Sequence, residues 1–339
     1  FEQNSLKNKN RNSFLKLFFL VATIITIFLI YKLKINNENI KKNDILKQQI
    51  QSDSFLLSNG FLMPKVGLGT AGLHGKTVCP ILAMAYDIGY RLIDTAAQKA
   101  VWYQNEFEIG NCLKTIRANR NDLFITTKLH PVDHGTHSSV SALQSSLRNL
   151  QTSHIDLLLF HYAECWGDVC AGDASSGDWR DSWRALTPFV RNGTVRALGV
   201  SNFHLPQLRE LLALIDSERL SPLVVVQDWM DPFHQARDKR VFCAKHNITF
   251  QAYSPLGGQY WQIKPNPVIN DATLTDIGKS RSFNAAQTTL QWMKQMNVAV
   301  VPKSTSEKHL LQNYNAVIQP RRALTTEELI EIEKLNGAL

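Results

Sequence analysis

Eight short apolar runs recur along most of the chain, and each is followed by a stretch with helical periodicity. The runs are KVGLGT, YRLIDT, LFITTKL, IDLLLFH, VRALGVSN, LVVVQD, ITFQAYSP and VAVVPKS, and helical segments such as SSVSALQSSLRNLQ and LPQLRELLALI lie between them. Strands that alternate with helices pair in parallel through crossovers. Eight such units over roughly 280 residues predict a closed (β/α)8 barrel, an α/β fold.

A β-hairpin is expected directly before the barrel. The segment FLLSNGFLMPKVG places Asn59 and Gly60 between two apolar runs, and this dipeptide is the strongest short signal for a tight hairpin turn. Such a hairpin would plug or cover the bottom of the barrel.

A second apolar segment lies near the start of the sequence. Fifteen residues from Leu17 to Tyr31 carry no charge, and Phe14 and Leu15 extend the segment past Lys16, which could snorkel to the headgroups. A buried core helix and a cleaved signal peptide are the alternatives, but no A-x-A-like site follows. We expect a single transmembrane helix at residues 14–31, with a short polar tail (1–13) before it and a polar linker (32–53) after it, so that the barrel occupies 54–339.

Charge says little about a further partner. The formal net charge is +8, but residues 1–50 contain nine Lys and Arg against three acidic residues, which leaves only +2 for the remainder. A nucleic-acid partner is therefore not supported. Because Lys residues flank the apolar segment on both sides, the positive-inside rule does not orient it.

The cysteines and two N-glycosylation sequons are relevant to the cellular compartment in which the barrel lies. Cys165 and Cys170 are close enough for a small-loop disulfide if the barrel faces an oxidising lumen, and Asn192 and Asn247 would then be glycosylation candidates. Reduced thiols and chance sequons are the alternatives. A lumenal side is slightly favoured. The odd number of cysteines, five, and the lack of a C-x-x-C motif argue against zinc, and we expect no metal.

A glycine motif offers a rival fold. Gly67, Gly69 and Gly72 spell G-x-G-x-x-G, and Asp94 follows about twenty residues later, which matches the dinucleotide fingerprint of a Rossmann dehydrogenase. The strand that leads into such a motif should be long and apolar, whereas Pro64 lies just before the first glycine. The barrel is therefore favoured.

Polar residues stand at the ends of the apolar runs, where a barrel of this kind places its working side chains. In chain order they are Asp94, Lys128, His161, Ser201 with Asn202, Gln227 and Tyr253. Tyr103 lies on the loop after the first of them. Its unperturbed pKa is about 10, so a nearby cation such as Lys128 would stabilise its phenolate while Asp94 holds the lysine, and His161 could orient an acceptor oxygen. The set predicts a site for proton donation at neutral pH.

With these motifs in order, the chain resembles the aldo-keto reductases from about Leu57 to Asn313. The motifs are LSNGFLMPKVGLGT, RLIDTA, FITTKL, DLLLFH, ALGVSNF, AYSPLG and VVPKSTSEKHLLQN. The resemblance implies reduction of an aldehyde or ketone with NADPH, NADH being possible. Hydride would pass from the nicotinamide to the carbonyl carbon while Tyr103 protonates the oxygen, and the implied catalytic tetrad is Asp94, Tyr103, Lys128 and His161.

The resemblance also implies a cofactor site and a substrate mouth. Ser201, Asn202 and Gln227 would hold the carboxamide, Tyr253 would stack on the nicotinamide, and Lys303 with Ser304 would meet the adenosine phosphate. The remaining implied cofactor positions are Thr70, Asp94, Ser254, Leu256, Thr305, His309 and Asn313. Tyr162 and Trp166 would form an aromatic mouth for apolar carbonyl compounds. The long insert around Trp166 could instead merely cover the barrel or be a docking surface.

Two departures from the family pattern have consequences. Four extra residues separate Asp94 from Tyr103; they could bulge outward or displace the hydroxyl. His309 aligns with the family's arginine, which weakens the partner for a 2′-phosphate, while Lys303 remains and favours NADP(H). The insertion keeps open a second hypothesis, a membrane-tethered, non-catalytic nucleotide-binding or regulatory subunit.

Overall fold

Eight parallel strands form one sheet in the computed structural model of the chain, in the order in which they occur in the sequence. They are β3 (Gly67–Gly69), β4 (Leu92–Asp94), β5 (Phe124–Leu129), β6 (Leu157–Phe160), β7 (Leu198–Ser201), β8 (Leu223–Trp229), β9 (Thr249–Tyr253) and β10 (Ala299–Val301). A parallel bridge between Val66 and Val300, and a bond from the Gly69 amide to the Pro302 carbonyl (3.0 Å), join the first strand to the last. The closed barrel is confirmed, and all eight apolar runs are strands.

The structure describes residues 32, 52–170, 174–175, 177–319 and 322–339, and the unit that contains the barrel comprises Asp53–Leu339. Within the described part, no helix is long and apolar enough to cross a bilayer. The expected span at 14–31 and the polar tail lie outside the described residues, as does most of the linker.

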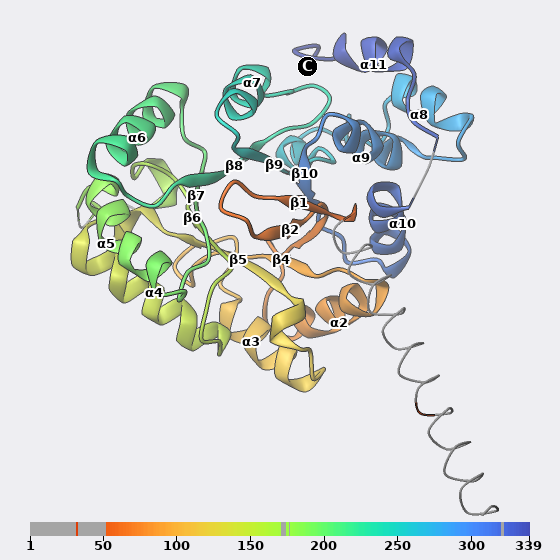
Figure 1. Cartoon of the computed structure of the whole chain (residues 1–339). Coiled ribbons are helices and arrows are strands. Elements are labelled where there is room, and N and C mark those ends of the chain that lie inside the picture. Colours follow the sequence, from red (N-terminus) through yellow and green to blue (C-terminus); the bar gives the residue numbers. More distant parts are fainter. Residues whose placement is uncertain (1–31, 33–51, 171–173, 176, 320–321) are drawn as a thin grey trace, which may run out of the picture. The chain divides into compact units, whose positions relative to one another are not determined.

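Helices surround the strands (Figure 1). They are α2 (Val78–Ile88), α3 (Glu106–Thr115), α4 (Thr136–Leu150), α5 (Trp179–Arg191), α6 (Leu205–Glu218), α7 (Arg237–Lys245), α8 (Ala272–Lys279), α9 (Ala285–Gln295), α10 (Glu307–Ile318) and α11 (Thr326–Glu333). Short 3₁₀ turns occur at η1 (Gly75–Thr77), η2 (Arg120–Asp122), η3 (Pro131–Asp133), η4 (Gly167–Val169) and η5 (Gly258–Tyr260). The helices pack apolar side chains inward, as Leu143 and Leu150 of α4 and Leu208 and Leu211 of α6 show.

The start of α5 shows why the long insert after β6 does not remain a loop. Asp178 caps the helix by accepting a bond from the Arg180 amide (2.6 Å), and Trp179 and Trp183 then face the core at 2% and 0% exposure. These two tryptophans, which the sequence places in the insert, are therefore core residues and not part of the mouth.

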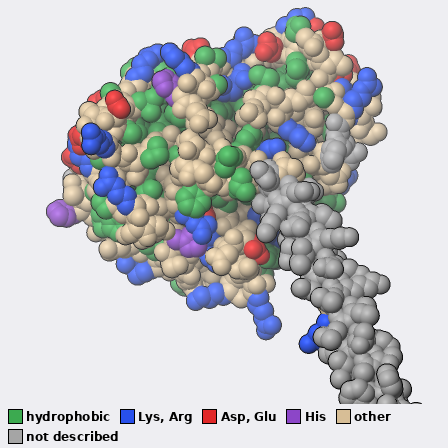
Figure 2. All heavy atoms as spheres, in the orientation of Figure 1, with side chains coloured by type: hydrophobic (Ala, Val, Ile, Leu, Met, Phe, Trp, Pro, Cys, Tyr) green, Lys and Arg blue, Asp and Glu red, His purple; other side chains and the backbone are tan. Residues whose placement is uncertain are grey.

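The expected hairpin consists of β1 (Ser54–Leu56) and β2 (Leu62–Pro64), paired antiparallel. Leu57 and Met63 pack against Leu92, Phe124 and Leu157, which are the first residues of three strands. The hairpin therefore closes the amino-terminal end of the barrel, as predicted. Figure 1 shows it in the middle of the ring of strands, and Figure 2 shows this face with hydrophobic side chains in patches and Lys and Arg mostly near its edge.

The glycines of the dinucleotide-like motif have a packing role instead. A Cβ on Gly67 would lie 2.2 Å from the Leu92 side chain, and one on Gly69 would lie 2.7 Å from the Val301 carbonyl oxygen. Both glycines permit β3 to approach its two neighbouring strands, so they serve closure of the barrel. The Rossmann alternative is wrong, because the sheet is closed and not an open, doubly wound one.

Candidate active site

A buried ion pair lies at the carboxyl end of the barrel. Lys128 in β5 donates from Nζ to Asp94 Oδ1 (2.6 Å), to the Thr95 carbonyl (2.9 Å) and to the Tyr103 hydroxyl (3.1 Å). The side chains of the lysine and the aspartate are only 1% and 3% exposed. An ammonium group has three hydrogens to donate, so these three acceptors use all of them and fix the group.

The loop with four extra residues brings Tyr103 to this ion pair. The Tyr103 amide bonds to the Ala100 carbonyl (2.8 Å), and the Trp102 carbonyl accepts from the Gly72 amide (2.6 Å). Lys99 and Asp133 pair across two loops (2.6 Å). Trp102 itself is half exposed, whereas Tyr103 is 9% exposed. The extra residues therefore turn outward, and the hydroxyl stays within hydrogen-bonding distance of Lys128.

The protonation states in the site follow from burial. Burial, and after it the Asp94 carboxylate, raises the pKa of Tyr103 well above its ordinary value. Burial lowers the pKa of Lys128, and Asp94 opposes that change. The expected stabilisation of the phenolate by Lys128 stays a prediction, since the ammonium lies within hydrogen-bonding distance of the hydroxyl (3.1 Å) while burial disfavours the charged form. Tyr103 keeps its proton and is available as a donor.

His161 follows β6 directly and faces the tyrosine. The two rings meet edge to face, with centroids 5.8 Å apart. Burial first, and then the charges of Lys128 and His130, hold the pKa of His161 well below its usual value, so the imidazole is neutral. Its Nδ1 is buried and has no hydrogen-bond partner among the described residues. A buried polar atom without a partner is costly, and an oxygen of a bound ligand would supply one.

Two glutamines connect the ion pair to the far side of the barrel. Gln227 donates from Nε2 to Asp94 Oδ2 (2.7 Å) and to Gln251 Oε1 (2.6 Å). Both bonds use the amide nitrogen, so Gln227 Oε1 is the atom that could accept from a carboxamide. Thr70 supports the same aspartate from the other side, since its Oγ1 donates to the Asp94 carbonyl (2.8 Å).

Ser201 ends β7, and Asn202 follows it beside Tyr253. Asn202 donates from Nδ2 to the His161 carbonyl (3.0 Å) and to Ser201 Oγ (3.1 Å), and it accepts the Tyr253 hydroxyl at 2.7 Å. Asn202 adopts a left-handed backbone (φ 60°), which asparagine tolerates better than most residues. The structure therefore brings the three residues together next to the tetrad.

The other predicted cofactor residues lie on the loops after β9 and β10. Ser254 (φ 51°) and Leu256 directly follow β9, and the Leu256 carbonyl accepts from Asn266 Nδ2 (3.1 Å). Lys303, Ser304 and Thr305 lie between β10 and α10, His309 is exposed in the first turn of α10, and Asn313 is buried further along it. These positions follow the carboxyl ends of β9 and β10, and the amino terminus of α10 is suited to a phosphate group.

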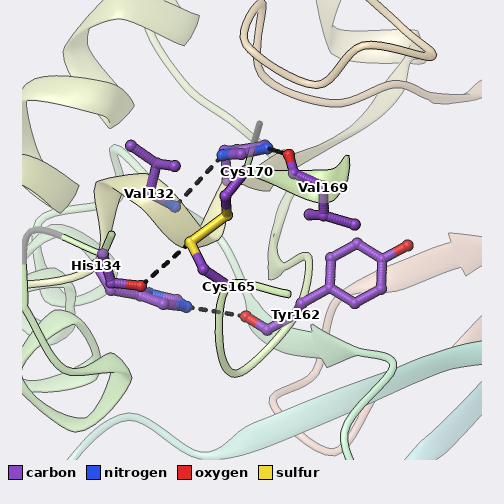
Figure 3. Close-up of a disulfide and its surroundings, with 8 residues drawn as sticks. Val132, His134, Tyr162, Cys165, Val169 and Cys170 are labelled. Carbon is purple, nitrogen blue, oxygen red and sulfur yellow. Dashed lines mark hydrogen bonds between the residues drawn. A yellow bond between two sulfur atoms is a disulfide. The ribbon is translucent and has the colours of Figure 1, made fainter. Parts of the chain in front are cut away.

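The mouth is aromatic beside His161. Tyr162 stacks on His161 with centroids 4.8 Å apart, and Trp166 meets Tyr162 edge to face at 5.6 Å. Trp166 is 57% exposed. A disulfide joins Cys165 to Cys170 on the same loop, and a second joins Cys79 to Cys112 (Figure 3 shows the first). The structure thus forms the pairing that the sequence left open.

Sequence reasoning missed three contributors. Thr95 supplies a carbonyl to Lys128, Gln251 bonds to Gln227, and Cys79 pairs with Cys112. The first follows Asp94 directly, and the second lies two positions before Tyr253, where the period of a strand places both side chains on one face. Their positions in the sequence could therefore have indicated Thr95 and Gln251. No sequence pattern indicated the cysteine pair, whose members are 33 residues apart.

Comparison with known proteins gives concordant matches. The profile of the Aldo/keto reductase family matches residues 65–337. Glyoxal reductase of Bacillus subtilis is 31% identical over 285 residues, which are 84% of this chain and 93% of the relative. Methylglyoxal reductase DkgA of Yersinia pestis is 32% identical over 282 residues, 83% of this chain and 91% of the relative.

Solved structures match over the same region. An aldo/keto reductase from Brucella melitensis is 29% identical with a TM-score of 0.70, covering 84% of this chain and 99% of that one. An aldo-keto reductase complexed with NADPH is 27% identical with a TM-score of 0.74, covering 84% of this chain and 88% of that one.

Proposed function

Because the chain belongs to the aldo/keto reductase family, we propose the roles that its own residues take in the reaction of this family, the NADPH-dependent reduction of an aldehyde or ketone to an alcohol. The observation that carries the proposal is the buried contact of Tyr103 with Lys128 and Asp94 beside a neutral His161. An acid, its cation and an orienting imidazole therefore meet at one point.

Tyr103 is the proton donor. It remains protonated because burial raises its pKa, and the adjacent ammonium of Lys128 lessens the cost when the phenolate forms as the proton leaves. Asp94 keeps Lys128 charged and in place. His161, neutral and with a ring nitrogen that no described residue bonds, orients the carbonyl oxygen toward the tyrosine.

The residues present fit NADPH. The Nδ1 of His161, the Oε1 of Gln227, and the amino terminus of α10 beside Lys303 offer partners for the reacting centre, the carboxamide and a phosphate. When bound, NADPH supplies the hydride. Tyr253, Ser201 and Asn202 would bind the nicotinamide end, and Ser304, Thr305 and His309 the adenosine end.

The substrate class follows from the mouth and the relatives. Two relatives are named for the reduction of glyoxal and methylglyoxal, and small dicarbonyl compounds of that kind are proposed substrates here. The aromatic pair of Tyr162 and Trp166 adds an apolar surface beside the imidazole, which would accept aromatic aldehydes as well.

The decisive experiment follows NADPH oxidation by the full chain in detergent with methylglyoxal and with aromatic and aliphatic aldehydes. Tyr103→Phe should lose about 10²- to 10⁴-fold in kcat yet bind NADPH as the wild type does. If the wild type binds NADPH but reduces no aldehyde of the panel, the non-catalytic nucleotide-binding hypothesis replaces this one.

We also propose that residues 14–31 anchor the protein in a membrane as a single span, with the barrel on the oxidising, lumenal side. The uncharged segment supports the anchor. Two disulfides and the exposed positions of both sequon asparagines, Asn192 and Asn247, support the side.

Glycosidase treatment of the protein made in eukaryotic cells tests the side. The wild type should shift in mass, and Asn192→Gln combined with Asn247→Gln should remove the shift. Alkaline extraction tests the anchor: the chain should stay with the membrane pellet. An unshifted wild type that a protease digests from the cytosolic side contradicts the lumenal placement.

A further inference from the structure

A disulfide and several hydrogen bonds hold the loop after β6 in place. Cys165 and Cys170 close a ring of six residues that contains Trp166 and the turn η4. Ser175 donates to Cys165 Sγ at 3.4 Å. Cys170 and Val169 are almost fully buried at 4% and 5%, whereas Trp166 is 57% exposed. One end of the ring is thus buried, and the tryptophan projects from it.

Two histidines from the loop after β5 bind the backbone of the loop after β6, one before this ring and one within it. His134 Nε2 bonds to the Tyr162 carbonyl at 2.8 Å, and His130 Nε2 bonds to the Val169 carbonyl at 3.0 Å. His130 accepts the Val132 amide on its other nitrogen (3.3 Å), which assigns the hydrogen to Nε2. Figure 3 shows the disulfide between these bonds, with Tyr162 close by.

The ring is continuous with the reacting centre. Trp166 contacts Tyr162, Tyr162 stacks on His161, and His161 contacts Tyr103, at centroid distances of 5.6, 4.8 and 5.8 Å. Trp166 is the last and most exposed member of this series. The histidine bonds fix the backbone at residues 162 and 169, and the Val169 amide donates to the Trp166 carbonyl (3.0 Å). The disulfide adds a covalent restraint on the turn from which the Trp166 side chain projects.

We propose that the Cys165–Cys170 disulfide determines substrate selectivity by fixing Trp166 against Tyr162 as an apolar wall for the bulky side of an aromatic carbonyl compound. This inference rests on the proposed reductase function and assigns one part of the mouth a specificity role. A small dicarbonyl compound does not reach the wall and is indifferent to it.

Thiol reagents should therefore disturb this apolar wall. A dithiol reagent attacks one sulfur and breaks the S–S bond, and exchange leaves two cysteine thiols here and one disulfide on the reagent. The two electrons and two protons come from the reagent. The loop then loses its ring closure but keeps both histidine bonds and the bond from the Val169 amide to the Trp166 carbonyl. The site therefore remains assembled, while the Trp166 side chain loses its covalent restraint.

The chain offers a matched control. The other disulfide, Cys79–Cys112, joins α2 to α3 outside the ring of strands. Cys165→Ser with Cys170→Ser and Cys79→Ser with Cys112→Ser therefore each remove one disulfide, and only the first pair lies at the mouth. KM and kcat are measured for methylglyoxal and for 4-nitrobenzaldehyde, with the Kd of NADPH alongside.

The first double variant should raise KM for 4-nitrobenzaldehyde about fivefold, as expected from loss of one aromatic contact. Its kcat, its KM for methylglyoxal and its Kd for NADPH should stay within about twofold. The control pair should leave the ratio of the two KM values unchanged. Should both pairs alter that ratio equally, or neither alter it, the specificity role is overturned.

Two further measurements keep the test decisive if a double variant fails to fold. Trp166→Ala with the disulfide intact should reproduce the rise in KM for the aromatic aldehyde, and dithiothreitol-treated wild type should do so reversibly. A Trp166→Ala enzyme with an unchanged KM overturns the inference alone, whereas a wild type that reduces neither aldehyde overturns the proposed function and this inference with it.

Discussion

Neither Lys128 nor Asp94 would be tolerated as a charge in this buried site without the other. Both side chains are buried, and the aspartate also accepts from Gln227. In a buried site a carboxylate is tolerated only with a cation and hydrogen bonds around it. Removing one partner of the pair therefore leaves the other as an uncompensated buried charge.

Removing the cation should expose this dependence. Lys128→Met is expected to lower the free energy of unfolding by about 3–5 kcal/mol, since it leaves Asp94 as a buried charge without its partner. Adding Asp94→Asn should recover part of that loss. Urea unfolding of the wild type, both single variants and the double variant measures the coupling, and strictly additive losses would contradict it.

His161 gives a second prediction, which concerns pH. Its pKa in the folded chain is well below the value of about 6.5 for an unfolded chain. Below that pH the unfolded state binds a proton that the folded state does not, so stability falls as the pH falls from 7 to 5, by up to about 1.4 kcal/mol per pH unit. His161→Gln should lose less stability between pH 7 and 5 than the wild type in chemical unfolding. An equal loss in both proteins would show that His161 does not titrate in this way.

The sequence was enough to find the residues of the site, but not to predict how burial shifts their pKa values. Asp94, Lys128 and His161 could be found because each stands at the end of an apolar run, and the ends of parallel strands meet at one rim. The direction of the Tyr103 pKa could not, because it depends on how completely the loop buries the phenol. That burial is a property of tertiary packing.

Among the elements, the loop between β4 and α3 decides whether the acid reaches its place. Its extra residues turn outward, the Lys99–Asp133 pair ties the loop to its neighbour, and Asn105 fixes its end by donating to the carbonyls of Thr70 and Leu73 (both 2.9 Å). Sequence alone could not choose between an outward bulge and a displaced hydroxyl, since both suit a polar loop of this length.

The amino terminus of α10 carries the third prediction. His309 is exposed in its first turn, where Lys303 provides the nearby cation of the proposed phosphate site. His309→Arg should strengthen binding of NADPH relative to NADH by about tenfold, because a planar, permanently charged side chain can bond a 2′-phosphate through two hydrogens. Fluorescence titration with each nucleotide measures the ratio.

His246→Arg serves as the matched control. It adds the same charge at an exposed histidine at the end of α7, the helix that leads into β9 at the opposite end of the barrel. The nucleotide ratio should stay unchanged there. If both variants shift it alike, general charge and not position is responsible.

For the whole molecule, the alternation of eight strand and helix segments was enough to predict a closed barrel, because eight such units complete one. What the alternation could not reveal is how β3 meets β10, which depends on the small size of Gly69 beside the Val301 carbonyl. The same glycine read as part of a dinucleotide motif pointed to a different fold, and only the packing distinguished the two.

The hairpin supplies the prediction at this scale. Met63 is fully buried among residues of the strand beginnings, so Met63→Ala should lower the free energy of unfolding by about 2–5 kcal/mol. The tetrad lies at the other end of the barrel, so KM and kcat should remain as in the wild type. Urea unfolding measures the loss of stability, and steady-state kinetics measure KM and kcat. A large change in KM without loss of stability would contradict the separate roles of the hairpin and the tetrad.

Of the two ends of the barrel, the hairpin closes one and leaves the other accessible. With the hairpin beneath and packed side chains between, both reactants of a reduction must enter and leave through the loops that surround Tyr103. The hairpin thus leaves both reactants one route to Tyr103, although none of its residues belongs to the tetrad.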